Sequence, residues 1–353
     1  MPRGLAVVYP VSELRAFAAA LLHATGLSGA RAEAVAAILV EGDLLGHDTH
    51  GMALLPIYLR EIESGSMRIV GEPDLLSDAG AAVTWDGCRL PGPWLVLRAL
   101  DLAAERAARY GVGTVVIKRS HHIACLATYL LRASERGLVM TLMSSAPSTA
   151  TVAPHGGTRG VLSPNPVACG FPTGDSAVLV DVSTSSTSNS LVHRLQKSGQ
   201  RLPHPWLVDR DGHPTDDPAA LADGAILPLG GIDSGHKGYG LSLMVEALTS
   251  GLAGHGRADA PEGMGANVFL QVFDPGRFGG LDAFRRQMQW TESACIDGPS
   301  RSAAGPVRMP GQGGLARRER QLRDGVHLES GTMEELRPWQ EKLGVPLPKT
   351  LPI

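Results

Sequence analysis

The stretch GTVVIKRSHHIACLATYLLRASERGLVMTLMS, residues 113–144, decides the fold class. Its apolar patterns predict a strand, a helix and a second strand over residues 113–118, 124–136 and 139–144. Strand, polar loop, helix and strand form the βαβ pattern, so the sequence predicts an α/β fold. The adjacent His121 and His122 follow the first strand, at the end where open α/β sheets bind ligands. One of the two could serve only as a hydrogen-bonding residue of the loop.

A second pair of histidines stands in residues 44–58, LLGHDTHGMALLPIY. An apolar helical run stops at Gly46, His47 and His50 follow, and a second apolar helix restarts after Gly51. Helix ends often carry a glycine and a cation, so an ordinary polar cap with one solvated and one packed histidine is one interpretation. The histidines after residue 120 favour the other interpretation, in which both segments contribute to one site.

Two further segments carry polar groups suited to a ligand. The strand over 178–181 ends in Asp181-Val182-Ser183-Thr184-Ser185, whose hydroxyls could bind a ribose or phosphate. A simple surface turn explains this loop about as well. Gly235-His236-Lys237-Gly238 is predicted to open a helix, where the lysine and the positive helix end would together bind a phosphate.

Composition excludes several classes of protein. The chain has 353 residues, a net charge of −3 and four cysteines without a CxxC pair, which argues against nucleic-acid binding, a zinc knuckle and a disulfide framework. The first residues lack a leader's apolar segment and no run could span a bilayer, so we expect a soluble, cytoplasmic protein without a membrane partner. No GxGxxG, Walker A, GxSxG or HExxH motif is present. Loop histidines suit proton transfer to or from a substrate oxygen, although their spacing alone does not name the reaction.

Six short motifs occur in the order typical of one family. They are Asp43, Gly46, Thr49-His50-Gly51, Pro56 and Tyr58; Ser120-His121-His122-Ile123-Ala124; Ser163-Pro164-Asn165-Pro166; Asp181-Val182-Ser183-Thr184-Ser185; residues 212–218; and His236-Lys237-Gly238-Tyr239. With them the sequence resembles the malate/L-lactate dehydrogenase family over about residues 10–345. This family is unrelated to the Rossmann-type lactate and malate dehydrogenases. It also includes ureidoglycolate, sulfolactate, diketogulonate and hydroxycarboxylate oxidoreductases and cyclic-imine reductases.

The resemblance implies an architecture. The expected fold is α/β, with a large mixed sheet that binds NAD(P) without the Rossmann fingerprint and a helical domain formed by the N-terminal and C-terminal segments. We therefore predict an N-terminal helical segment, an NAD(P)-binding domain and a C-terminal segment that packs with the N-terminal helices, over residues 1–75, 76–300 and 301–353. Family members are typically homodimers, so a homodimer is expected.

The resemblance also implies a reaction, hydride transfer between NAD(P) and C2 of a 2-hydroxy or 2-oxo acid. By this resemblance His122 is the acid/base, and His50 lies beside the nicotinamide and substrate. The implied cofactor contacts are Ser120, His121, Asp181, Val182, Ser183, Thr184, Ser185, His236 and Lys237, and the implied substrate contacts are Thr49, Leu54 and Tyr58. NAD is slightly favoured over NADP, and no metal is required.

Departures from the family pattern bear on specificity. Leu54 stands where the family commonly has an arginine that grips a carboxylate, which favours a substrate with an apolar or bulky side chain over malate. Ser163-Pro164 replaces Gly-Thr, and Ser190-Leu191 replaces Gly-Lys. Two alternatives stay open, a cyclic-imine reductase on the same fold and a member that has lost catalysis or binds metal. Retention of both His50 and His122 argues against the second.

Overall fold

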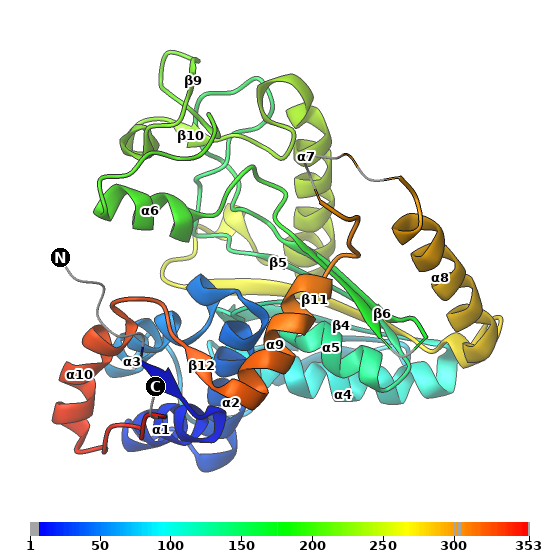
Figure 1. Ribbon diagram of the computed structural model, residues 1–353, viewed down its shortest axis with the longest axis horizontal. Coiled ribbons are helices and arrows are strands. Elements are labelled where there is room, and N and C mark those ends of the chain that lie inside the picture. Colours follow the sequence, from blue (N-terminus) through cyan, green and yellow to red (C-terminus); the bar gives the residue numbers. More distant parts are fainter. Residues whose placement is uncertain (1–6, 175, 300, 302–304, 352–353) are drawn as a thin grey trace.

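A seven-stranded mixed sheet forms the centre of the molecule (Figure 1). The computed structural model describes residues 7–174, 176–299, 301 and 305–351; the prediction about a leader falls partly on residues 1–6, outside these ranges. The strands, in spatial order, are β2 (Asp74–Asp78), β3 (Ala82–Asp86), β4 (Val112–His121), β11 (Gly265–Phe273), β5 (Val139–Ser145), β6 (Val167–Pro172) and β7 (Ala177–Val182). The predicted α/β class with a mixed sheet is confirmed.

The stretch that predicted the fold forms β4, α5 (Ala127–Glu135) and β5. β11 lies between β4 and β5 and pairs antiparallel with both, so β4 and β5 are parallel without being neighbours. Helix α5 begins three residues later than predicted, because Ala124 has a φ of 59°, a left-handed conformation that a helix cannot contain. β4 ends at His121, which places both histidines at the carboxyl end of the strand as predicted.

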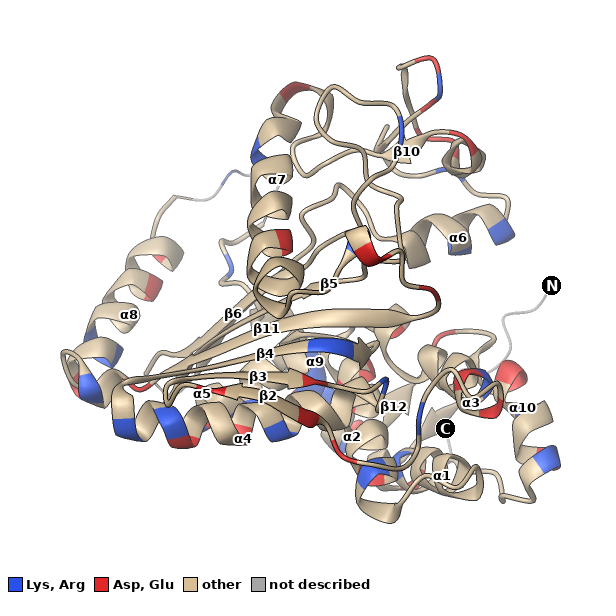
Figure 2. Ribbon diagram, turned by 180° about the vertical axis from the view of Figure 1, so that it is seen from behind, with Lys and Arg blue, Asp and Glu red and all other residues tan. Residues whose placement is uncertain are grey.

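Helices cover both faces of the sheet (Figure 1). α4 (Gly92–Tyr110) contacts β4 with a face rich in buried alanine and leucine, and α5 contacts β6. Figure 2 shows charged residues of both signs along the exposed side of α4. On the other face lie α7 (Gly231–Glu246) and a π-helical turn (Ala247–Gly251), where Val245 packs with Val116 and Phe269 of the sheet.

The N-terminal and C-terminal segments pack together as a helical layer, as the fold prediction required. This layer contains α1 (Val11–Ala24), α2 (Gly29–Leu45), α3 (Leu55–Glu63), α9 (Gln312–Asp324) and α10 (Thr332–Leu343). α2 contacts α9, α3 contacts α10, and β1 (Val8–Tyr9) pairs with β12 (Val326–His327). The layer thereby places the turn after α2 against the edge of the sheet.

The remaining elements are shorter. A small sheet is formed by β8 (Leu207–Val208), β9 (Pro214–Thr215) and β10 (Ala225–Ile226), and it lies near α6 (Asn189–Lys197) in Figure 1. Helix α8 (Leu281–Ile296) lies at the far end of the sheet, and five 3₁₀ turns span Asp48–His50, Met52–Leu54, Pro218–Ala222, Arg257–Asp259 and Pro275–Arg277. Within the described ranges, no helix combines the length and the apolar character needed to cross a membrane.

The prediction that Gly235-His236-Lys237-Gly238 opens a helix is wrong. Helix α7 begins at Gly231, after a left-handed Gly230, so this segment lies in the second turn. The glycine at 238 serves close packing, because a Cβ there would lie 2.4 Å from the Leu229 nitrogen. His236 and Lys237 are exposed on the helix and do not form its N-terminal end.

Candidate active site

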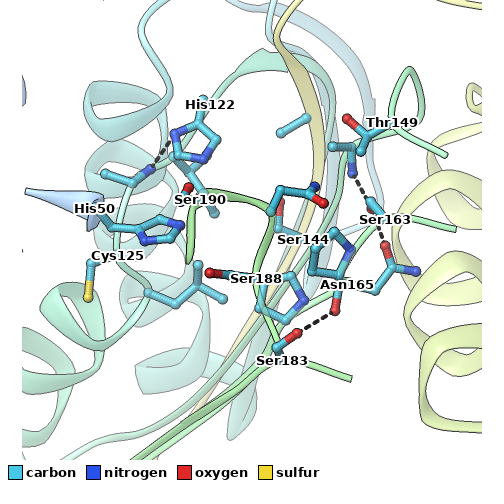
Figure 3. Close-up of a pocket in the computed structure, with 18 of the residues that line it drawn as sticks. His50, His122, Cys125, Ser144, Thr149, Ser163, Asn165, Ser183, Ser188 and Ser190 are labelled. Carbon is cyan, nitrogen blue, oxygen red and sulfur yellow. Dashed lines mark hydrogen bonds between the residues drawn. The ribbon is translucent and has the colours of Figure 1, made fainter. Parts of the chain in front are cut away.

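A cavity of about 440 Å³ opens where the helical layer meets the ends of β4, β5 and β7 (Figure 3). Its volume is within the range of small-molecule sites. The lining comes from six segments: His47, Thr49 and His50; residues 122–126; residues 144–149; residues 163–166; Asp181, Ser183 and residues 188–190; and residues 264–266. The structure thus brings together five predicted residues: His50, His122, Thr49, Asp181 and Ser183.

The ring of His122 is anchored through one nitrogen. Its Nδ1 accepts a hydrogen bond from the backbone N–H of Ala124 at 3.2 Å, drawn in Figure 3, and lies 2.9 Å from the Tyr58 hydroxyl oxygen. The Tyr58 hydroxyl also donates to the His122 carbonyl oxygen at 3.1 Å. Both anchors engage Nδ1, which leaves Nε2 for proton exchange.

The two partners of Nδ1 favour different proton positions. A backbone N–H only donates, so Ala124 stabilises a ring whose Nδ1 carries no proton. A tyrosine hydroxyl both donates and accepts, so Tyr58 can accept from a protonated Nδ1 while giving its own proton to the His122 carbonyl oxygen. The ring can therefore hold its proton on either nitrogen, as a residue that both gives and takes protons requires.

Burial keeps both cavity histidines neutral. It lowers the pKa of His122 to about 3, with His50 and His121 adding repulsion, and it lowers the pKa of His50 to about 4, with His47 contributing. The two rings stack with centroids 5.9 Å apart. Thr49 Oγ1 lies 3.0 Å from His50 Nδ1 and orients that ring. An anion bound beside the pair would raise both pKa values.

Tyr58 lies behind His122 and does not face the cavity. Its side chain is fully buried, and burial raises the pKa of its hydroxyl, which therefore stays protonated. Tyr58 was expected to contact substrate, but in the structure its hydroxyl contacts His122 instead. Sixty-four positions separate the two residues in the chain, so sequence spacing carries no signal for this pair.

Ser120 and His121 point away from the main cavity. They line a second cavity of about 190 Å³, and His121 Nε2 lies 3.3 Å from Glu61 Oε2. Burial lowers the pKa of His121 to about 4 although Glu61 opposes this shift. The Ser120 hydroxyl donates to the His121 carbonyl oxygen. The structure therefore separates these two predicted cofactor contacts from His122.

The hydroxyl-rich loop after β7 is divided between cavity and interior. Asp181 and Ser183 line the cavity, whereas Val182 is exposed outside it. Thr184 donates to the Pro164 carbonyl oxygen at 3.0 Å and Ser185 donates to that of Thr187 at 2.7 Å. The last two hydroxyls thus bind the protein's own backbone, where a bound ribose or phosphate was expected. Asp181 accepts the Ala127 N–H at 2.9 Å, and burial raises its pKa.

Leu54 does not line the cavity and packs in the main core, with 5% of its surface exposed. Asp43 sets this orientation by accepting the Met52 N–H at 2.7 Å, and a Cβ at Gly51 would collide with that carboxylate. The prediction that Leu54 contacts substrate therefore lacks the required geometry. His236 and Lys237, on α7, also lie outside the cavity lining.

One supporting network escaped the sequence reading. Arg257 binds Glu246 at 2.9 Å and donates to the Thr149 carbonyl oxygen at 2.5 Å, which fixes the cavity segment 146–149. Asn165 also donates to Glu246, at 3.0 Å. Asn165 lies 81 positions from Glu246. It belongs to one of the six motifs, whereas Glu246 and Arg257 belong to none, so no sequence pattern connects the three.

The donor set of the cavity fits a dinucleotide. Hydroxyls and amides are the most numerous polar groups of the wall, and the buried Oδ1 of Asn189 has no hydrogen-bond partner among the described residues, as an acceptor awaiting a ribose or carboxamide donor would be. The first turn of α6 borders the cavity through Ser188, Asn189 and Ser190, and a helix N-terminus suits a phosphate. None of the described lining residues is lysine or arginine.

Comparisons with known proteins agree with this geometry. The chain matches the family described as malate/L-lactate dehydrogenase over residues 9–337. It is 31% identical to a (2R)-3-sulfolactate dehydrogenase (NADP(+)) of Chromohalobacter salexigens, covering 92% of this chain and 96% of the relative. The structure of malate dehydrogenase from Pyrococcus horikoshii OT3 has a TM-score of 0.88 at 26% identity, and the match covers 98% of this chain and 99% of that structure. The structure of a delta1-piperideine-2-carboxylate reductase from Pseudomonas syringae pv. tomato has a TM-score of 0.81 at 27% identity. That match covers 94% of this chain and 99% of the reductase.

Proposed function

This chain belongs to the malate/L-lactate dehydrogenase family, and we propose that it transfers a hydride between NAD(P) and C2 of a 2-hydroxy or 2-oxo carboxylic acid. One observation carries the proposal. His122 lines the cavity with Nδ1 anchored by Ala124 and Tyr58, which leaves Nε2 to exchange a proton with a substrate oxygen. The family membership supplies the reaction class, and the geometry supports the residue that moves the proton.

The nicotinamide, when bound, supplies or accepts the hydride. Asn189, Ser188 and Ser190 would hold the cofactor through hydroxyl and amide groups and the first turn of α6. The absence of lysine and arginine from the described lining favours NAD, because a 2′-phosphate commonly takes a cationic partner.

With its own proton on Nδ1 and donated to Tyr58, His122 takes the hydroxyl proton on its unprotonated Nε2 during oxidation and returns that proton during reduction. Tyr58 supports both states, since its hydroxyl accepts from Nδ1–H when the ring is charged. The substrate carboxylate raises the pKa of His122 from its low value in the free protein, because an anion stabilises the imidazolium. His50, stacked at 5.9 Å, forms the adjoining wall. Substrate binding should therefore be accompanied by proton uptake.

We propose a substrate with an apolar or bulky side chain, on a ground other than Leu54. The cavity wall offers Ile123, Leu126 and Met264 as apolar surface. A second carboxylate, such as that of malate, would find no lysine or arginine among the described lining residues. A panel of 2-oxo acids tests this: kcat/KM should be higher for branched or aromatic substrates than for oxaloacetate, and the reverse order would contradict it.

A second candidate is a cyclic-imine reductase, supported by the TM-score of 0.81 to the delta1-piperideine-2-carboxylate reductase. The same cavity would then bind a cyclic imine carboxylate, and His122 would protonate nitrogen instead of oxygen. Parallel assays of 2-oxo acids and cyclic imine carboxylates with NADH and NADPH separate the two reactions. Turnover of the imines alone would move the assignment to this reductase.

The first test measures cofactor binding. Wild type, His122→Ala and the exposed control His213→Ala are titrated with NADH and NADPH while nicotinamide fluorescence is followed. All three should bind, while turnover in His122→Ala should fall by about 10²–10⁴-fold. If wild type bound neither cofactor at millimolar concentration, the changes at Ser163-Pro164 and Ser190-Leu191 would mark a lost cofactor site and the proposal would fail.

We also propose that the chain acts as a homodimer. Large apolar side chains are exposed on α7 and α8, including Leu243 and Trp290, which are 46% and 71% exposed. Exposed large apolar side chains on a helix surface mark candidate protein interfaces. Sedimentation velocity should give the mass of two chains, and a monomer at micromolar concentration would contradict the proposal.

A further inference from the structure

Three side chains with metal-ligating atoms meet at one wall of the cavity. His47 follows α2, Cys125 lies in the loop after β4, and Asp181 lies in β7. Their ligand atoms all lie within 4.8 Å of one another, and all three residues line the cavity. Figure 3 shows Cys125 on the same side of the cavity as His50. We propose that His47, Cys125 and Asp181 bind a zinc ion, or a divalent cation of similar softness.

The distances suit such an ion after small side-chain rotations. Zinc binds sulfur at about 2.3 Å and nitrogen or oxygen at about 2.0–2.2 Å, so tetrahedral ligands stand roughly 3.5 Å apart. The Cys125 Sγ to Asp181 Oδ2 distance is 3.9 Å, and the other separations do not exceed 4.8 Å. Three protein ligands leave the fourth position facing the cavity, as in open zinc sites.

The cluster offers the donor atoms that zinc prefers, a thiol, an imidazole and a carboxylate. Asp181 and Cys125 are two acidic groups in contact inside the protein, and Cys125 is only 3% exposed. A thiolate, a carboxylate and a neutral histidine carry two negative charges, which a divalent ion neutralises while the thiol proton leaves to solvent.

The backbone holds the ligands in place. The Ala127 N–H donates to Asp181 at 2.9 Å, and the Thr128 hydroxyl donates to the Cys125 carbonyl oxygen at 2.8 Å. The backbone N–H of His47 donates to the Gly42 carbonyl oxygen at 2.9 Å. Such outer contacts orient metal ligands before the ion arrives. The metal site does not depend on the proposed dehydrogenase activity, although an ion there would compete for the cavity with cofactor and substrate.

Direct metal binding tests the proposal in a Cys295→Ser background, which removes the exposed thiol. Zinc is titrated by calorimetry in two buffers of different ionisation enthalpy, and cobalt(II) is titrated by absorbance. We expect one ion per chain, proton release, and a thiolate-to-cobalt charge-transfer band. Cys125→Ser should abolish the band and weaken zinc binding by more than about 100-fold, beyond the effect of losing an outer partner.

Two further variants complete the design. Cys169→Ser, a half-buried cysteine on β6 outside the cavity, should keep both the band and the affinity. His47→Ala should weaken zinc binding while the cobalt band, where cobalt still binds, remains. The proposal is overturned if wild type binds no stoichiometric zinc, if cobalt binds without a thiolate band, or if Cys125→Ser binds zinc as tightly as its parent. None of these readouts requires NAD(P) turnover, so failure of the proposed function would be seen separately.

Discussion

His121 and His122 are neighbours in the chain, yet they belong to two different regions of the molecule. His121 faces the smaller cavity with Glu61 as its partner, whereas His122 faces the main cavity with Tyr58 and Ala124 as partners. Burial lowers the pKa of both rings, to about 4 and about 3. Burial and a low pKa therefore do not distinguish a catalytic histidine here. What distinguishes His122 is that its Nε2 remains available to a ligand in the main cavity.

The largest expected effect comes from removing the ring on the cavity side. His122→Gln keeps a polar side chain but cannot exchange a proton, so kcat should fall by about 10²–10⁴-fold while NADH affinity changes little. His121→Gln is the matched control, and its kcat should remain within a factor of a few of wild type. Steady-state kinetics with fluorescence-detected NADH binding measures both. Equal losses in the two variants would erase the distinction between the regions.

Tyr58→Phe should produce the next largest effect, because it removes only the hydroxyl behind His122. Without an acceptor for Nδ1–H the imidazolium is destabilised, so the pKa of His122 in the enzyme–substrate complex falls. A drop of one unit lowers the rate of reduction at neutral pH by about tenfold. The kcat profile of 2-oxo acid reduction should show its descending limb at lower pH. An unchanged profile with lower kcat would assign Tyr58 a packing role only.

Much of this contrast could be predicted, because its parts are local in sequence. The strand before residue 120 and the helix after it follow from apolar periodicity, and the strand end identified the histidine pair. Apolar pattern and spacing did not indicate which histidine of the pair faces the main cavity, and only the family resemblance pointed to His122. That choice depends on Tyr58 and Glu61, which lie 64 and 60 positions away.

Errors arose where one residue type serves two physical purposes. Glycine marks helix starts and also permits close packing, and Gly238 does the second, so the anion site expected at Lys237 has the wrong geometry. Leucine at 54 was compared with a family arginine, yet the turn held by Asp43 directs it into the core. β11 enters the sheet from more than 100 positions away, which no local pattern around β4 or β5 announces.

A smaller effect links the two histidines to stability. Their folded pKa values lie below 6.5, so between about pH 6.5 and pH 4 the unfolded chain binds more protons and each ring's contribution is lost as pH falls. In that window, each ring lowers the free energy of unfolding by up to about 1.4 kcal/mol for every unit by which the pH falls. Asp43 and Asp181, whose pKa values are raised, oppose this trend, so variants are compared with wild type.

The stability measurement follows urea unfolding from pH 7 to pH 4 in wild type, His121→Gln and His122→Gln. Each variant should show a shallower decline in unfolding free energy than wild type, by a similar amount. Activity separates the two histidines and stability should not, because desolvation lowers the pKa of both rings and keeps them neutral. Parallel curves for all three proteins would mean that neither ring resists protonation in the folded state.

The smallest effect is expected at Glu61. Glu61→Gln keeps a hydrogen-bond acceptor 3.3 Å from His121 Nε2 and removes the charge. Glu61 raises the pKa of His121, so its neutralisation lowers that pKa further and leaves the ring neutral at pH 7. Since partly exposed pairs contribute roughly 0–1 kcal/mol, the midpoint of urea unfolding should move little at pH 7 and fall slightly more steeply toward pH 4. kcat should be unchanged, because Glu61 acts on the ring that faces away from the main cavity. A large loss of activity in this variant would show that the two regions are coupled through the backbone of residues 121–122. The two histidines would then differ in position but not in their importance for activity.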